Sequence, residues 1–315
     1  MKNLKDSVRD AANLKCRLLF LLLAMVCSTQ LVCAYKPYDC CIDGIFYRLR
    51  EGSSGNTAIV NPQRFDYKKG NNTYDGHLVI PKEVTYKGQT YRVTEISSVA
   101  YEDCSGLTAV TIPNSVKKIG RGAFNECPNL KKVIIEDGEE ELMIETGSFI
   151  EKSPVESVYM GRNLRWNSPK SPFADMNRNV SSFEIGPAVT TLTEYIFCGC
   201  KGLNSVVIPE SVTKIGNNAF ENSGLSTITI PESVTEIGEE AFKGCAHLET
   251  VTLPNGLPAI GASIFRGCES LRSVNIPSAV TKIEDRTFMN CKALASVTIP
   301  NNVKVVGTQA FYSCI

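Results

Sequence analysis

The side chains that most often carry chemistry are sparse in this chain. Only two histidines occur, His77 and His247, and neither forms part of the nucleophile, base and acid arrangement that a catalytic triad requires. Cys198-Gly-Cys200 is a close pair of thiols without the further ligands of a zinc site. Gly120-Arg-Gly122 lacks the third glycine of a phosphate-binding loop. The residue types therefore predict no catalytic centre, no metal site and no bound cofactor.

The charged residues also narrow the range of partners. Thirty-three basic side chains balance 33 acidic ones, so the formal net charge is zero. A neutral chain lacks the positive surface of a nucleic-acid binder and the polybasic attraction to anionic lipid. The acidic run Glu136–Glu141 is interpreted as a solvated loop, with Ca²⁺ capture left open although the spaced ligands of a known calcium loop are missing. Nucleic acid is not an expected partner.

The first 34 residues have the features of a targeting segment. Basic residues precede an apolar run over residues 18–27, and Val32-Cys33-Ala34 offers small residues at a cleavage site. The run is too short to span a bilayer, which needs roughly 20 residues. We predict a signal peptide over 1–34 and an exported mature protein without a transmembrane segment. An uncleaved anchor is the alternative.

One phrase recurs along most of the chain. It reads IPESVTKIGNNAF from Ile208, IPESVTEIGEEAF from Ile230 and IPSAVTKIEDRTF from Ile276. An aromatic closes each unit, at Tyr101, Phe124, Phe149, Phe173, Phe197, Phe220, Phe242, Phe265, Phe288 and Phe311, and every step is 22 to 25 residues. Self-similarity at this period predicts a solenoid, in which each unit buries its apolar face against its neighbours.

Each part of the unit predicts a local structure. The L-x-x-V-x-I segment, as in Leu294–Ile299, alternates like a strand, and the proline after it can end the strand ladder. V-T-x-I-G predicts a second short extended segment. Its glycine, four residues before the aromatic, suggests a tight corner or a φ that other residues avoid. The A-F-x-x-C piece predicts one helical or 3₁₀ turn.

Cysteines recur three residues after the aromatic. Equivalent positions in stacked units lie about 4.8 Å apart, the strand spacing of a sheet, whereas disulfide-bonded Cβ atoms lie about 3.5–4.5 Å apart. We therefore predict buried thiols along this ladder, and Cys40 and Cys41 are the better candidates for a disulfide. The ladder comprises Cys104, Cys127, Cys200, Cys245, Cys268, Cys291 and Cys314.

The organisation along the chain follows from where the repeat starts and weakens. Ile45–Arg50 and Thr57–Asn61, separated by a glycine- and serine-rich turn, predict a β-hairpin. This hairpin places a small N-terminal β cap over 35–76, which would shield the first edge of the solenoid. The repeat array is expected over 77–315. It is irregular at 136–196, where Gly186 stands in place of proline.

The consensus I-P-x-S-V-T-x-I-G-x-x-A-F-x-x-C-x-x-L-x-x-V-T resembles the BspA-like leucine-rich repeats of bacterial surface and secreted proteins. The resemblance covers roughly residues 78–315, about three quarters of the chain. It implies a leucine-rich-repeat solenoid, a right-handed superhelix of units of about 23 residues. It also implies export and adhesion to host proteins or other cells.

Two surfaces are candidates for recognition. Small hydroxyl side chains line the outward strand positions in the C-terminal half, either from strand propensity alone or as a flat surface for extended partners such as glycans. These hydroxyl rows are Thr227, Thr229, Thr250, Thr252, Ser273, Ser296 and Thr298. The irregular middle brings aromatics and arginines, the usual anchors of interfaces, although its tryptophan could simply fill space beneath a loop. This predicted patch comprises Ile134, Tyr159, Arg162, Arg165, Trp166, Glu184 and Tyr195.

The sequence thus favours an exported, non-enzymatic protein that binds proteins or glycans of host or neighbouring cells, secreted or on the bacterial cell surface. Two alternatives stay open. A structural envelope component could self-associate through the C-terminal end, since the array stops after Cys314 with an exposed edge. An enzyme acting on glycans could use Glu184, if a second carboxyl lay roughly 5–9.5 Å away in a cleft.

Overall fold

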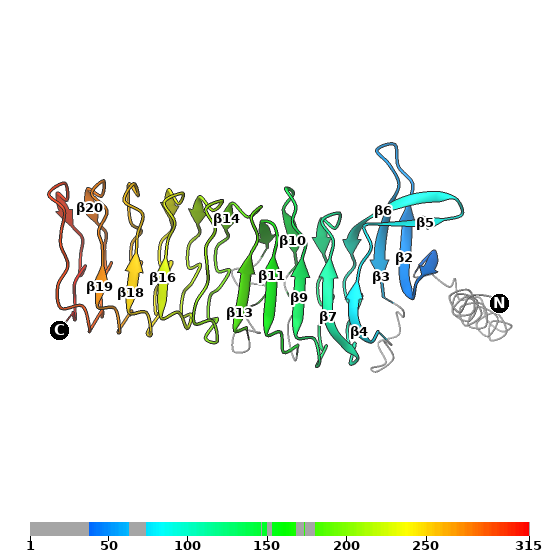
Figure 1. The fold of residues 1–315 in the computed structure, drawn as a ribbon, viewed down its shortest axis with the longest axis horizontal. Coiled ribbons are helices and arrows are strands. Elements are labelled where there is room, and N and C mark those ends of the chain that lie inside the picture. The colour runs from blue at the N-terminus through cyan, green and yellow to red at the C-terminus, as the bar shows by residue number, and fades with distance from the viewer. Residues whose placement is uncertain are drawn as a thin grey trace, which may run out of the picture.

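The computed structural model describes residues 38–62, 74–145, 147–149, 153–167, 173 and 180–314. The predicted signal peptide, 1–34, lies outside these residues. The described chain forms one stack of β rungs that leads from the N-terminal cap to the C-terminal rung (Figure 1). The predicted leucine-rich-repeat solenoid is confirmed.

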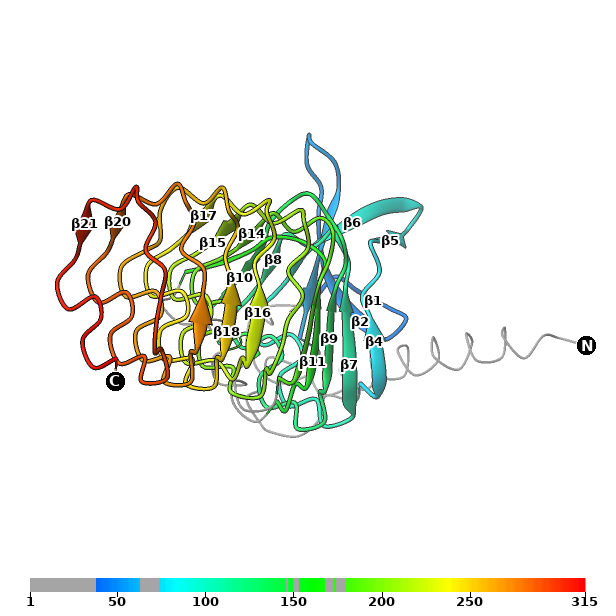
Figure 2. The ribbon, with the colours of Figure 1, turned by 60° about the vertical axis from the view of Figure 1, so that its left-hand side comes forward.

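The strands fall into two rows on different sides of the stack (Figure 2). We call the row built from the L-x-x-V-x-I segments the first face. Its strands pair in parallel as a five-stranded sheet, in the order β13-β11-β9-β7-β4, and a three-stranded sheet, β16-β18-β19. Their bounds are β4 Gly76–Val79, β7 Leu107–Ile112, β9 Lys132–Ile135, β11 Ser157–Met160, β13 Ser182–Ile185, β16 Thr227–Thr229, β18 Thr250–Thr252 and β19 Ser273–Val274.

The V-T-x-I segments form the second face, whose strands are shorter. From β6 onward its strands also pair in parallel, in three separate groups: β6-β8-β10-β12, β14-β15-β17 and β20-β21. The bounds are β6 Gln89–Ile96, β8 Lys118–Ile119, β10 Leu142–Ile144, β12 Leu164–Trp166, β14 Thr191–Leu192, β15 Lys214–Ile215, β17 Glu236–Ile237, β20 Lys282–Ile283 and β21 Val305–Val306.

The cap extends the second face beyond the first rung. Strands β1 (Cys40–Ile42), β2 (Ile45–Arg50) and β3 (Thr57–Asn61) pair antiparallel, and β3 then pairs in parallel with β6. Strand β5 (Glu83–Tyr86) folds back on β6 as an antiparallel hairpin. The predicted β cap is therefore present, and it covers the N-terminal edge of the second face.

A column of stacked aromatic rings runs through the interior. Neighbouring rings lie nearly parallel, with centroids 5.2 Å apart for Phe124 and Phe149 and 5.7 Å apart for Phe242 and Phe265. The column is interrupted once, by Phe183 of β13, which lies edge-on between Phe173 and Phe197. Phe183 replaces the strand valine of the neighbouring rung and so fills the core where the repeat is irregular.

The predicted helical or 3₁₀ turn around the aromatic is not supported by the structure. No described residue is helical, and the segment is a run of turns in which alternate N–H groups point to the next rung. Glu240, Phe242 and Gly244 donate to the next rung's carbonyls at 3.0, 3.0 and 2.7 Å. The residues two before and two after the aromatic take positive φ, 56° at Glu240 and 71° at Gly244. Because of this alternation, every second peptide N–H points toward the next rung. In an α-helix the N–H groups point along the helix axis instead.

The recurring glycine four residues before the aromatic lies where the backbones of two neighbouring rungs approach each other closely. A Cβ on Gly238 would lie 2.6 Å from the backbone nitrogen of Asn217, and φ at Gly238 is not in the left-handed region. The sequence suggested a tight corner or a φ that other residues avoid; the φ explanation is wrong for Gly238, and the structure shows instead that backbone packs on backbone between rungs.

The cysteine ladder forms no disulfide among the described residues; its thiols are buried from Cys104 to Cys291, and several donate hydrogen bonds. The thiol of Cys268 lies 3.1 Å from the Phe242 carbonyl of the preceding rung, and the pattern recurs along the ladder. Ser153 stands in for a ladder cysteine, and its hydroxyl donates to the Phe124 carbonyl at 2.9 Å. Burial raises the pKa of Cys245 to about 11, so the donor stays protonated. Cys40 and Cys41 form no disulfide with another described residue.

Candidate functional site

The first face brings three residues of the predicted patch into one outward row. Ile134, Tyr159 and Glu184 are direct cross-strand partners on β9, β11 and β13. Ile134 and Tyr159 are half-buried and Glu184 is exposed. The same row begins at Val79 of β4, which is 57% exposed and is separated from Ile134 by Thr111. Apolar and aromatic side chains thus interrupt an otherwise polar sheet surface.

Tyr159 is held in place by a neighbouring loop. Its hydroxyl donates to Asp137 Oδ1 at 2.7 Å, and this bond raises the pKa of Tyr159 to about 12. Gly186 makes room for the pair, because a Cβ there would lie 2.6 Å from Asp137 Oδ1 and 2.8 Å from the Tyr159 hydroxyl. The glycine that replaces the expected proline therefore serves this contact. The ring of Tyr159 is presented in one orientation, which reduces the entropy lost on binding a partner.

Arg162 does not belong to any recognition surface. Its side chain is fully buried, and its Nη1 and Nη2 donate to the carbonyls of Asn114 and Pro113, both at 3.0 Å. Burial lowers the pKa of Arg162 to about 10. The side chain crosses Gly138, where an added Cβ would lie 3.3 Å from Arg162 Cδ. Arg162 thus links three rungs from within, which its sequence position among surface residues did not reveal.

The other predicted residues lie elsewhere on the solenoid. Arg165 and Trp166 belong to β12 on the second face, where Arg165 lies 3.6 Å from Glu141 and Trp166 packs half-buried against the core. Tyr195 is in the turn segment with φ of 62°, and its N–H donates to the Asn217 carbonyl at 3.0 Å. The seven predicted residues therefore do not form one patch. The row of Ile134, Tyr159 and Glu184 is the part that is brought together.

The hydroxyl rows are present over β16, β18 and β19. Thr227, Thr250 and Ser273 are cross-strand partners, as are Thr229 and Thr252, and all five are exposed. The second row ends at Asn275, whose amide bonds both backbone groups of Leu253 at 2.8 Å. Ser296 and Thr298 are exposed in a segment without an assigned strand. The rows form a flat, uncharged, hydrogen-bonding surface.

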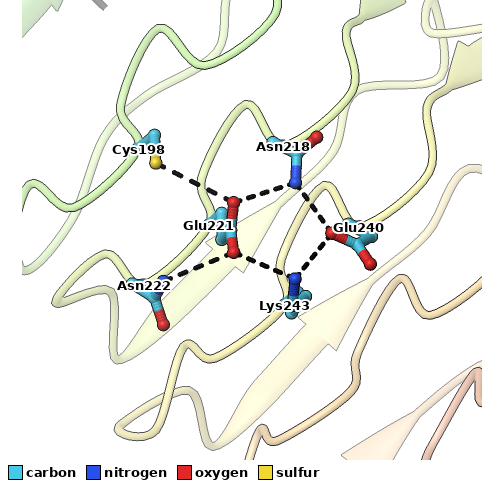
Figure 3. Close-up of polar contacts among 6 residues, drawn as sticks. All are labelled: Cys198, Asn218, Glu221, Asn222, Glu240 and Lys243. Carbon is cyan, nitrogen blue, oxygen red and sulfur yellow. Dashed lines mark hydrogen bonds and ion pairs between the residues drawn. The ribbon is translucent and has the colours of Figure 1, made fainter. Parts of the chain in front are cut away.

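A charged cluster on the turn side joins two neighbouring rungs, and the thiol of Cys198 on a third rung lies 3.9 Å from Glu221 Oε2 (Figure 3). Glu221 accepts a hydrogen bond from Asn218 at 2.9 Å and lies 3.1 Å from the ammonium of Lys243. Lys243 lies 2.7 Å from Glu240, which also accepts from Asn218 at 3.0 Å. Each carboxylate is thus occupied by neighbours within the chain. The cluster connects rungs and offers no ready ligand position.

The described residues show no feature of a metal centre or a membrane span. No group of three or more His, Cys, Asp or Glu side chains in that part of the chain could hold a metal ion. His77 Nε2 instead lies 2.8 Å from the Thr111 hydroxyl. Nor does the described region contain a helix that is long and apolar enough to cross a bilayer.

Comparison with solved structures finds leucine-rich repeat proteins and a vaccine antigen, all from bacteria. A leucine-rich repeat protein of Bacteroides ovatus is 24% identical (TM-score 0.45), and the match covers 88% of this chain and 80% of that one. A leucine rich cell surface protein of Faecalibacterium prausnitzii is 23% identical (TM-score 0.42; 85% and 84% covered). The pneumococcal vaccine antigen PcpA is 20% identical (TM-score 0.49; 85% and 77% covered). No curated protein matches this chain.

Family assignment rests on the repeats themselves. The model of the BspA type leucine-rich repeat region matches six copies, over residues 82–204 and 190–315. These ranges include every rung from the first hairpin of the array to the C-terminus, well over half of the chain. The chain therefore belongs to the BspA-type leucine-rich repeat family.

Proposed function

We propose that this protein is exported and binds proteins or glycans at the bacterial cell envelope, without catalysing a reaction, and that it acts in adhesion. The observation that carries the proposal is the outward row of Ile134, Tyr159 and Glu184 on the first face. A half-buried aromatic fixed by a hydrogen bond and flanked by an aliphatic side chain is typical of an interface anchor.

The architecture supports binding on a surface. A solenoid presents long, regular faces, and its interior is filled by the aromatic column and the aliphatic strand positions. Membership of a repeat family and the predicted signal peptide agree with this proposal. The hydroxyl rows of β16 and β18 add a polar region farther along the first face, suited to the hydroxyl groups of a glycan.

Self-association is a second candidate. In the last described rung, Val305, Val306 and Tyr312 are 50%, 51% and 56% exposed. Stacking of this rung against a second copy would bury these side chains and pair the edge of β21. Light scattering of the mature protein tests this candidate, since a strictly monomeric protein at high concentration contradicts it.

Binding is tested with the mature chain, starting at residue 35, on an array of host-matrix proteins and glycans. The double substitution Ile134→Ser/Tyr159→Ser removes the anchor row, and Thr250→Val/Thr252→Val removes hydroxyls while it keeps strand propensity. We expect the first variant to lose protein binding by about tenfold or more. If only Thr250→Val/Thr252→Val lost binding, the binding site would be the hydroxyl rows. If wild type bound nothing, or if both folded variants bound fully, the proposal would fail.

A further inference from the structure

The first face has an open edge at strand β4. This strand ends the five-stranded sheet, and it is the outermost strand of the first face on the side of the cap (Figure 2). On the second face the cap continues the sheet through β3, β2 and β1. No strand in the described part of the chain pairs with the outer side of β4. Among the described residues, the cap thus continues one face of the solenoid and leaves the outer side of β4 unpaired on the other.

The backbone groups on this open edge can be identified. The N–H groups of Gly76 and Ile80 donate to the carbonyls of Gly106 and Thr111, at 2.9 and 3.1 Å. Successive residues of a strand direct their peptide groups to opposite edges. His77 and Val79 therefore direct their N–H and C=O groups away from β7. Such a row of backbone donors and acceptors is a template for another strand.

A groove of about 540 Å³ lies between this edge and the cap. The volume is within the range of about 300–1,000 Å³ that is usual for ligand sites. Apolar side chains from both sides line it: Ile42, Ile45, Leu78, Val79 and Val84. The groove can therefore accommodate backbone and apolar side chains together.

The polar lining of the groove is acidic. Asp43, Asp75 and Glu83 line it, no lysine or arginine does, and none of the three has an ion-pair partner among the described residues. Tyr47 lines it as well. Its side chain is fully buried, and its hydroxyl has no hydrogen-bond partner there. The hydroxyl itself is not accessible from the groove, so the charged groups that the groove offers to a ligand are the three carboxylates.

We propose that β4 binds an extended peptide carrying a basic side chain, which adds to the first face as a further strand. The peptide backbone pairs with His77 and Val79, an apolar side chain covers Val79, and a lysine or arginine meets the carboxylates of Asp43, Asp75 and Glu83. Strand addition of this kind obtains affinity from main-chain bonds and specificity from side-chain pockets. A glycan could hydrogen-bond to the carboxylates, but it has no peptide backbone and could not pair with β4 as a strand. The inference goes beyond the proposed function by naming a partner class for the β4 edge, where the outward row begins at Val79, two strands away from Ile134.

The first test measures peptide binding to the mature protein by calorimetry. The probe is an acetylated and amidated hexapeptide of alternating valine and lysine. Its valine–glutamate counterpart and a version N-methylated on alternate amides serve as controls. We expect the lysine peptide to bind about tenfold or more tightly than either control, and added salt to weaken it. Equal binding of the lysine and glutamate peptides, or no binding of the lysine peptide, would overturn the proposal.

The second test changes the edge without changing the sheet. Val79→Pro removes an N–H that faces the groove and makes no bond to β7, so the fold should be retained, whereas Val79→Thr keeps the N–H. We expect Val79→Pro to weaken the lysine peptide about tenfold and Val79→Thr to bind normally. Asp43→Asn/Glu83→Gln should weaken it as well, and Glu210→Gln, at an exposed position on the array, should not. Full binding by a folded Val79→Pro variant contradicts the proposal.

The experiments distinguish failure of the β4 peptide site from failure of the proposed anchor row. Ile134→Ser/Tyr159→Ser should leave peptide binding intact, because the anchor row lies on neighbouring rungs and not in the groove. Peptide binding without any array partner would uphold this inference and overturn the anchor-row proposal. If Val79→Pro instead abolished dimerisation of the protein and the peptide did not bind, the edge would belong to a second copy and the inference would be wrong.

Discussion

At the scale of single residues, the cysteine ladder combines two roles that no other small side chain provides together. The thiol fills an apolar core position, and it donates to a carbonyl of the preceding rung, as Cys268 does to Phe242. The spacing predicted burial, and the structure confirms it for the ladder from Cys104 to Cys291. The donor role could not be predicted, because it depends on the turn geometry that leaves this carbonyl able to accept a second bond. Arg162 was missed for a similar reason, since sequence does not show which loop covers a side chain.

Substitution of Cys268 should separate packing from hydrogen bonding. Cys268→Ala leaves a void and removes the donor to Phe242, so we expect a loss of about 1–3 kcal/mol in the free energy of unfolding. Cys268→Ser keeps a donor, as Ser153 does naturally, and should cost less. Urea unfolding of both variants measures the difference. Equal losses would show that the thiol acts only by filling space.

Stability should fall at alkaline pH because of the buried thiols. Burial raises the pKa of Cys245 to about 11 and that of Cys291 to about 12, from an ordinary value of 9.0. Below pH 9.0 the thiols are protonated in both states, and their contribution is complete. As the pH rises from there toward about 11 to 12, only the unfolded thiols lose protons, so the free energy of unfolding decreases. Urea midpoints across this range check the trend, and Cys245→Ala should give a shallower decline; an unchanged midpoint in wild type would contradict it.

At the scale of elements, the repeat pattern predicts the strands well and the turns poorly. Alternation in L-x-x-V-x-I predicted β18 and its neighbours, because strand period follows directly from side-chain pattern. The helical interpretation of A-F-x-x-C failed, although glycine or asparagine recurs two residues after the aromatic. Glycine and asparagine tolerate positive φ better than other residues, so their recurrence was the sequence evidence for a non-helical turn. The residues are Gly199, Asn222, Gly244, Gly267 and Asn290.

A pair of glycines tests the close approach between rungs. Gly238→Ala would push a Cβ against the backbone of Asn217, so we expect a loss of roughly 1–3 kcal/mol. Gly256 has open space around its Cβ position and no positive φ. Gly256→Ala should therefore leave the free energy of unfolding unchanged or raise it by about 0.4–1 kcal/mol. Thermal or urea unfolding compares the two, and a tolerated Gly238→Ala would refute the packing argument.

At the scale of the whole molecule, one apolar interior continues through a region where the hydrogen-bonded sheet is interrupted on both faces. The first face ends one sheet at β13 and begins the next at β16, and the second face does so between β12 and β14. The core nevertheless continues, because Phe183 bridges Phe173 and Phe197 and the buried residues form one cluster. The period predicted this shared core from sequence. The change of sheets and the open β4 edge could not be predicted, since they depend on which strands find partners.

The shared interior is tested most directly by urea unfolding of Phe220→Ala and Phe311→Ala. Phe220 packs between two rings, Phe197 and Phe242, whereas Phe311 stacks on Phe288 alone among the described residues. The account predicts one cooperative transition, a loss of about 3–5 kcal/mol for Phe220→Ala and less than half of it for Phe311→Ala. Equal losses, or two transitions divided between the β1–β13 and β14–β21 parts, would contradict it.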